Sequence, residues 1–257
     1  MVFELKDKVA LITGGASGVG LRYAKELLRK GVKGATLADI DPQLGQTALT
    51  EIEKEFGANK AIFTKTDVTD IQQFEDAFKK TVETFGHIDI LFNNAGILND
   101  SIWQKQIAIN MNGVIHGMLL GMEDYLQKYK QGSEAVIEFF GFIPIYSGTK
   151  SAVVAMTRNW GTPDHYQRTK VRVIAICPGV THTPLIFDMA GRNLGEPYQQ
   201  ILDNNLSNIP SQEPEHLASE VVKLVTDGEN GTIWVVEGGQ PAYEFIIPER
   251  KIEGLSK

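Results

Sequence analysis

The stretch that decides the fold is Thr13–Gly20, which reads TGGASGVG. It follows an apolar run, Lys8–Thr13, that is typical of a buried strand, and it leads into Val19–Lys30, where apolar residues recur at helical spacing. The spaced glycines allow a sharp turn, a close approach of phosphate to the backbone and tight packing of the helix on the strand. The helix N-terminus adds free N–H groups and a partial positive charge. Strand, glycine turn and helix in this order predict a dinucleotide-binding unit.

The same alternation continues along the chain. Six further apolar runs are predicted as strands: Ala35–Ala38, Ala61–Phe63, Ile88–Phe92, Ala135–Phe140, Val171–Cys177 and Thr232–Val236. Helices are predicted at Pro42–Phe56, Ile71–Phe85, Ile102–Tyr129 and Tyr146–Trp160. Strands that alternate with helices imply parallel βαβ units, and burial on both sides explains continuously apolar strands. We therefore predict an α/β fold of the Rossmann type in one domain, 1–257, a doubly wound parallel sheet of seven strands with helices on both faces.

Composition excludes several classes of protein. A net charge of −7 argues against nucleic acid as a partner, since binding along a phosphate backbone needs a basic face. The single cysteine, Cys177, rules out an internal disulfide, and the five histidines show no metal-ligand spacing, so we expect no metal site. The N-terminus lacks the order of a signal peptide, and no apolar run approaches the roughly 20 residues of a membrane helix. We expect no membrane partner and a cytoplasmic location.

Asp39 indicates which dinucleotide is bound. It ends the second predicted strand, where the adenosine ribose arrives in this type of fold. A carboxylate there accepts both ribose hydroxyls and repels a 2′-phosphate, and no Lys or Arg lies in the glycine turn or in the two residues after Asp39. The alternative is a solvated strand-end or capping aspartate, a role that suits Asp41 before Pro42 better. The sequence favours NAD over NADP.

Further motifs, in the same order along the chain, resemble the short-chain dehydrogenase/reductase family over about 8–236. They read DV at Asp67–Val68, NNAG at Asn93–Gly96, YSGTK at Tyr146–Lys150 and PGVTHT at Pro178–Thr183. Within the family, the sequence is most similar to those of insect alcohol dehydrogenases and NAD-dependent 15-hydroxyprostaglandin dehydrogenases.

The resemblance implies the roles of particular residues. The catalytic residues that it implies are Asn110, Tyr146 and Lys150. The cofactor-binding residues that it implies are Gly14, Ser17, Gly18, Val19, Gly20, Asp39, Asp67, Val68, Asn94, Ala95, Gly96, Tyr146, Lys150, Pro178, Gly179, Val180 and Thr183. It also implies a homodimer or homotetramer, and a substrate-covering segment at about 184–209. The apolar content of that segment suggests an apolar alcohol or ketone as substrate.

The spacing of Tyr146 and Lys150 suggests proton transfer. Residues four apart share one face of a helix. A tyrosine ionises near pH ~10, which is too high for a base at neutral pH, and a nearby ammonium lowers that value. The hypothesis is that Tyr146 removes the proton of an alcohol while hydride passes to NAD, with Lys150 also holding the nicotinamide ribose and Asn110 anchoring a water relay, as the family resemblance implies. The alternative is an incidental pair on the helix surface.

The sequence departs from the family at one catalytic position. The family carries a serine just beyond the fifth strand, yet no serine or threonine lies between Val136 and Tyr146. Ser133 has the right separation from Tyr146 but precedes the strand, and Ser147 and Thr149 are not placed by the motif to replace the missing residue. Loss of one such donor costs roughly 10²–10³ in rate at comparable sites. Two function classes therefore stay open: an NAD-dependent oxidoreductase for secondary alcohols and ketones, and a catalytically impaired NAD-binding relative.

Overall fold

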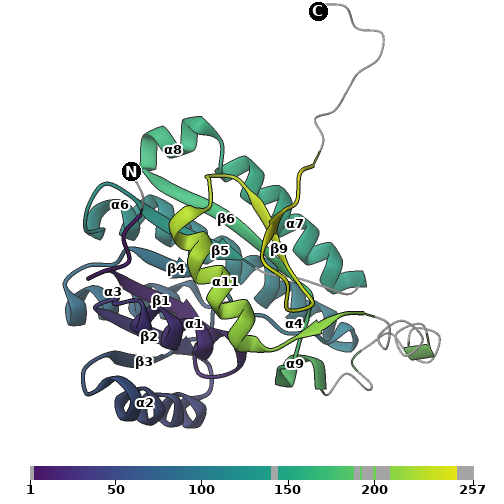
Figure 1. Cartoon of the computed structure of the whole chain (residues 1–257), viewed down its shortest axis with the longest axis horizontal. Coiled ribbons are helices and arrows are strands. Elements are labelled where there is room, and N and C mark those ends of the chain that lie inside the picture. The colour runs from purple at the N-terminus through teal and green to yellow at the C-terminus, as the bar shows by residue number, and fades with distance from the viewer. Residues whose placement is uncertain (1–2, 140–143, 188–191, 193–198, 201–208, 248–257) are drawn as a thin grey trace, which may run out of the picture.

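The computed structural model describes residues 3–139, 144–187, 192, 199–200 and 209–247, and within these ranges all side chains except those of 138–139, 144–147 and 187. One large sheet runs in the order β10-β9-β6-β5-β4-β1-β2-β3 (Figure 1). Its strands are β1 (Val9–Thr13), β2 (Gly34–Asp39), β3 (Ala61–Lys65), β4 (Ile90–Phe92), β5 (Ala135–Phe139), β6 (Val171–Pro178), β9 (Ile233–Val236) and β10 (Tyr243–Glu244). The predicted α/β fold is confirmed.

The sheet has one strand more than the seven predicted. Strands β1 to β6 and β9 pair in parallel and match the seven predicted runs, whereas β10 pairs antiparallel with β9 at the edge. Both residues of β10, Tyr243 and Glu244, are exposed. A two-residue exposed strand has no apolar run, so the pattern that revealed the other strands does not reveal this one.

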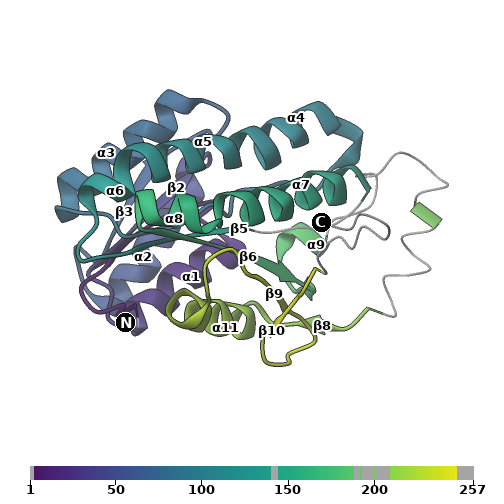
Figure 2. The same cartoon turned by 90° about the horizontal axis from the view of Figure 1, so that it is seen from above.

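Helices cover the sheet in two layers (Figure 2). On one face lie α1 (Gly18–Arg29), α2 (Pro42–Phe56) and α11 (Pro214–Asp227), and on the other lie α3 (Ile71–Phe85), α7 (Pro144–Trp160) and the long middle helix. Side chains of one strand alternate between the layers: Ala10 and Ile12 of β1 join the first core and Leu11 the second. This burial on both faces explains the continuously apolar strands.

Some of the described helices were not predicted from the sequence. Among them are α8 (Pro163–Thr169), α9 (Pro184–Phe187) and α11, which packs against α1. The signals for α11 were present, because Pro214 stands at the first helical position and Leu217, Val221 and Leu224 follow at helical spacing. No described helix is long and apolar enough to cross a membrane.

The long middle helix is interrupted by wider turns. It runs through α4 (Trp103–Ile107), α5 (Val114–Met118) and α6 (Leu126–Tyr129), with π-helical turns η2 (Ala108–Gly113) and η3 (Leu119–Tyr125) between them, after the short 3₁₀ turn η1 (Asp100–Ile102). Such turns are rare and are frequent at functional sites. Turn η2 contains Asn110, one of the predicted catalytic residues.

The connection between β5 and α7 is short, as the sequence indicated. Strand β5 ends at Phe139 and α7 begins at Pro144, so only residues 140–143 separate them. Ser133 is exposed and precedes the start of β5 at Ala135. It therefore lies at the amino end of the strand, where the sequence placed it.

The strand order creates a crevice at one edge of the sheet. From β1 the chain proceeds outward to β2 and β3, and from β4 it proceeds in the opposite direction to β5, β6 and β9. Ligands of open α/β sheets bind at this reversal, outside the carboxyl ends of the strands. The crevice between β1 and β4 is thus where a site is expected.

Candidate functional site

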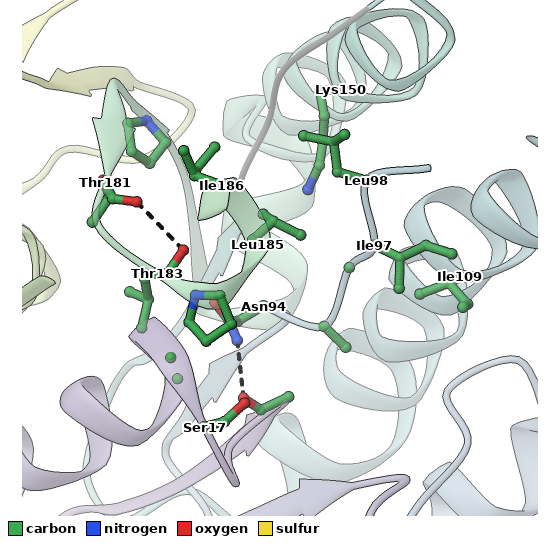
Figure 3. A pocket seen from close by; sticks show the side chains of 18 of the residues that line it. Ser17, Asn94, Ile97, Leu98, Ile109, Lys150, Thr181, Thr183, Leu185 and Ile186 are labelled. Carbon is green, nitrogen blue, oxygen red and sulfur yellow. Dashed lines mark hydrogen bonds between the residues drawn. The ribbon is translucent and has the colours of Figure 1, made fainter. Parts of the chain in front are cut away.

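A cavity of about 570 Å³ opens at the carboxyl ends of the strands (Figure 3). The predicted cofactor residues that line it are Gly14, Ser17, Gly18, Val19, Gly20, Asp39, Asp67, Val68, Asn94, Ala95, Gly96, Lys150, Pro178, Gly179, Val180 and Thr183. They lie at or just after the carboxyl ends of β1, β2, β3, β4 and β6 or stand on α1 and α7, so segments that are distant in sequence meet in one space.

The glycine turn adopts the backbone conformation that its composition predicts. Gly14 and Gly18 have φ of +63° and +53°, in the left-handed region that favours glycine. A Cβ on Gly20 would stand 2.2 Å from the Gly14 carbonyl oxygen. The first turn of α1 can therefore pack against the glycine loop only because residue 20 has no side chain. At Gly18, by contrast, an added Cβ would meet no atom within 4 Å. The space in front of the N-terminus of α1, at Gly18, is therefore open.

The N-terminus of α1 differs from those of the next two helices. In α2 and α3, the carboxylates of Asp41 and Asp70 each accept hydrogen bonds from two backbone N–H groups. At α1 the capping residue, Ser17, makes no side-chain hydrogen bond to the helix, and Ser17–Gly20 borders the cavity. An uncapped N-terminus offers its N–H groups and partial positive charge to an anion.

Asp39 is held at the end of β2 beside the glycine turn. Its Oδ2 accepts a hydrogen bond from the Ala16 N–H (3.1 Å) and its Oδ1 one from the Asp41 N–H (3.2 Å). Asp41 itself caps α2, as the sequence suggested. The Asp39 carboxylate is therefore free of the capping role and lines the cavity.

The ends of β1 and β4 are joined by Thr13 and Asn94. Asn94 Nδ2 donates to the Thr13 carbonyl oxygen (2.8 Å), and the Ala95 N–H donates to Thr13 Oγ1 (3.0 Å). Thr13 Oγ1 also donates to the Phe92 carbonyl oxygen (3.2 Å). Asn94 thus fixes the two loops at the strand reversal relative to each other.

Asn110 and Lys150 meet at Gly96. The side-chain amide of Asn110 is fully buried and bonds both the N–H and the carbonyl oxygen of Ile97, each at 2.9 Å. A Cβ on Gly96 would lie 3.4 Å from Asn110 Oδ1 and 3.8 Å from Lys150 Nζ. Lys150 is 7% exposed and reaches from α7 toward the cavity beside Leu98 (Figure 3). The structure therefore brings two of the three predicted catalytic residues together.

Asp67 and Val68 form the wall beside β3. Asp67 Oδ1 accepts hydrogen bonds from the Thr69 N–H (2.9 Å) and Oγ1 (2.7 Å). Val68 is buried, and its side chain leaves no room for a Cβ on Gly113, the last residue of η2. Asp67 is thus held by hydrogen bonds from Thr69, and Val68 packs against the middle helix at Gly113.

The loop after β6 forms the opposite wall. A Cβ on Gly179 would stand 2.5 Å from the Cβ of Glu237, the residue after β9, so these two segments are in close contact. Thr183 Oγ1 donates to the Thr181 carbonyl oxygen (3.4 Å; Figure 3). His182 pairs with the exposed Glu213 (2.7 Å) and does not line this cavity.

Two sequence predictions fall largely outside the described residues. The side chain of Tyr146 is one of them, although its backbone lies in α7 with Lys150. The other is the covering segment, of which α9 (Pro184–Phe187) and a few later residues are described. Five lining residues belong to the predicted covering segment: Pro184, Leu185, Ile186, Arg192 and Ile209. The lining residues that were not assigned to the site from the sequence are Ile40, Thr66, Ile97, Leu98, Ile109, Thr181 and Glu237. Glu237 directly follows the predicted strand Thr232–Val236, a signal that could have identified it, whereas Thr66 directly follows β3 only because that strand extends to Lys65, beyond its predicted end at Phe63.

Comparison with known proteins agrees with this geometry. A family model described as short chain dehydrogenase matches residues 8–190. Human 15-hydroxyprostaglandin dehydrogenase [NAD(+)] is 34% identical over 90% of this chain and 91% of its own, and alcohol dehydrogenase 2 of Ceratitis rosa is 30% identical over 91% and 93%. The crystal structure of levodione reductase, 28% identical, superposes with a TM-score of 0.75 over 91% of this chain and 97% of that one.

The expectation of NAD agrees with the cofactor in the human relative's name. The relatives also match the two groups that the sequence resembles, and both groups are named as dehydrogenases. This chain is therefore a member of the short chain dehydrogenase family of oxidoreductases.

Proposed function

We propose that the protein binds NAD(H) in the cavity at the strand reversal and interconverts a secondary alcohol and a ketone by hydride transfer. The observation that carries the proposal is the meeting of the glycine turn, Asp39 and Lys150 around one cavity. The names of the related dehydrogenases support the same reaction class and cofactor.

The described residues fit a dinucleotide. The open space at Gly18 and the uncapped N-terminus of α1 suit a pyrophosphate, which needs close backbone approach and N–H donors. Asp39, braced by Ala16, suits the two hydroxyls of an unphosphorylated ribose. The proposed binding residues are the cavity-lining set given above, together with Tyr146.

The chain's own residues would then handle the proton. When bound, the nicotinamide supplies the hydride acceptor. Tyr146 removes the proton of the substrate hydroxyl, and the Lys150 ammonium favours the phenolate form of Tyr146 because opposite charges attract. Asn110 holds the Ile97 backbone through two hydrogen bonds and so fixes the loop beside Lys150. The substrate proton passes to Tyr146 Oη.

The lining suggests an apolar substrate. Many aliphatic side chains border the cavity, among them Ile97, Leu98, Ile109, Leu185, Ile186 and Ile209. Apolar walls favour an apolar body, because its burial removes apolar surface from water. We further propose that the protein acts in the cytoplasm as a homodimer or homotetramer, a state that light scattering after size-exclusion chromatography would measure.

A panel of secondary alcohols with NAD, followed by NADH absorbance, tests the reaction. The panel should pair aliphatic alcohols of increasing chain length with short polar ones. Binding is measured separately, by the change in NADH fluorescence on titration. Turnover that rises with chain length supports the proposal, and failure to bind NADH would overturn it.

A second candidate function has its own observation. No hydroxyl-bearing residue lies between Val136 and Tyr146, and only residues 140–143 separate β5 from α7. The family's serine donor has no counterpart there, which favours a catalytically impaired protein that acts by binding NAD(H). NADH binding without turnover of any alcohol or ketone in the panel would select this candidate.

A further inference from the structure

Gln212 is a buried side chain that no predicted motif includes. It ends β8 (Ser211–Gln212), which pairs in parallel with β7 (Val180–Thr181), and it is 4% exposed. Its Nε2 donates to the carbonyl oxygen of Val236, the last residue of β9 (2.6 Å), and to Thr181 Oγ1 (3.3 Å). One side chain thus joins the small sheet to the end of the large one.

Both acceptors are also bonded to Gly179. The Gly179 N–H donates to the Val236 carbonyl oxygen (2.9 Å), and Thr181 Oγ1 donates to the Gly179 carbonyl oxygen (3.0 Å). The four hydrogen bonds close a ring through Gly179, Val236, Gln212 and Thr181. A closed ring fixes the turn at Gly179–Thr181 at both its ends.

The turn is part of the cavity wall, whereas Gln212 is not. Gly179, Val180 and Thr181 line the cavity and Gln212 does not. The main chain of Gln212 supports the same turn, because its carbonyl oxygen accepts the His182 N–H (3.0 Å). The position of this wall therefore depends on contacts from a residue that does not line the cavity.

Stability alone does not account for a glutamine at this position. Gln212 Oε1 is buried, and among the described residues it has no hydrogen-bond partner. Burying an unpaired amide oxygen costs free energy, which an aliphatic side chain of similar size would avoid. What an aliphatic side chain cannot supply is the Nε2 donor that reaches Val236 and Thr181 together.

We propose that Gln212 is a positioning residue, which holds the Gly179–Thr181 turn against the end of β9 and so sets the wall of the NAD(H) cavity. The inference rests on the proposed function for the identity of the ligand. It requires that Gln212 affect the binding of NADH without touching it.

The test compares Gln212→Met with Asn230→Ala. Asn230 is also a side-chain amide brace, which bonds the Gly161 carbonyl oxygen (2.7 Å) and the Val173 N–H (2.9 Å), but it does not line the cavity and lies near the amino end of β6. In Gln212→Met both hydrogen bonds from Nε2 are lost, and we expect the NADH Kd to rise by roughly three- to tenfold because the turn is held less firmly in its binding position. In Asn230→Ala we expect a lower Tm with an unchanged Kd.

Amide hydrogen exchange of the protein without cofactor gives a second measurement. Gln212→Met should speed exchange at the Gly179 N–H. If Gln212→Met does not fold, Thr181→Val, which breaks the same ring of hydrogen bonds, replaces it in the exchange measurement. Unchanged exchange at Gly179, or faster exchange with an unchanged NADH Kd, would overturn the inference and leave the proposed function standing. If the unmodified protein failed to bind NADH, the proposed function would be wrong, and so would this inference about the wall of the NADH cavity. The binding titration of the unmodified protein thus distinguishes failure of the proposed function from failure of this inference alone.

Discussion

The Asp39 carboxylate accepts a hydrogen bond from the Ala16 N–H at 3.1 Å, so the residue that ends β2 braces the glycine turn that follows β1. One carboxylate therefore has two separable properties, a hydrogen-bond acceptor for the turn and a negative charge at the cavity. Substitutions can remove one and keep the other.

Asp39→Asn should change cofactor preference while keeping the brace. The amide oxygen of asparagine can still accept the Ala16 N–H, but the charge that repels a 2′-phosphate is gone. We expect the ratio of the Kd for NADPH to that for NADH to fall by roughly tenfold or more. Fluorescence titration with both cofactors measures it. An unchanged ratio would show that the Asp39 charge does not select NAD.

Gly18→Ala should weaken NADH binding more than it weakens the fold. The left-handed φ of Gly18 makes an alanine cost about 1–2 kcal/mol in stability, and its methyl group would enter the open space before α1. The matched control is Gly86→Ala, at the end of α3, where φ is +88° and the Cβ position is equally open. The Tm of thermal unfolding should fall in both variants, whereas NADH affinity should fall only in Gly18→Ala. Equal NADH affinity in both would contradict phosphate binding at Gly18.

Tyr146→Phe should abolish turnover and leave NADH binding intact. Removal of a general base costs roughly 10²–10⁴ in rate, whereas the ring that remains preserves the volume of the side chain. The measurement is kcat with the best alcohol of the panel, beside the NADH Kd. Tyr129→Phe, at the exposed end of α6, is the control and should behave as the unmodified protein does. Retained turnover in Tyr146→Phe would remove Tyr146 from the mechanism.

Glu220→Gln should lower stability in a pH-dependent way. Burial raises the pKa of Glu220, but hydrogen bonds from Lys223 and from the Ala242 N–H outweigh burial, so the pKa lies below its usual value. A carboxyl with a lowered pKa in the folded state stabilises the fold above its unfolded pKa of about 4.3, and this contribution is lost as pH falls through the folded pKa.

The difference in unfolding free energy between the unmodified protein and Glu220→Gln should thus be about 1 kcal/mol at pH 7 and should narrow as pH falls below the unfolded pKa of about 4.3. Urea unfolding at several pH values measures it. Glu215→Gln on the same helix, where the side chain is 62% exposed, should show little difference at any pH. A difference that does not narrow as the pH is lowered would mean that the charge of Glu220 does not stabilise the fold.

The sequence by itself determined the parallel sheet and the place of the cavity. Buried strands must be apolar on both faces, and the glycines between Thr13 and Gly20 satisfy local backbone requirements, so both features can be recognised without knowledge of distant contacts. The loss of the serine before Tyr146 is equally local, because it depends only on the residues between β5 and α7.

Only the tertiary structure decided which distant side chains meet. Glu237 reaches the cavity because β9 pairs with β6, and Gln212 supports Gly179 because β8 pairs with β7. The edge strand β10 was missed for the same reason, since its two exposed residues are defined by pairing with β9. Strand pairing brings together residues that are far apart in the chain, and neither apolar periodicity nor turn chemistry records which partners a strand will find.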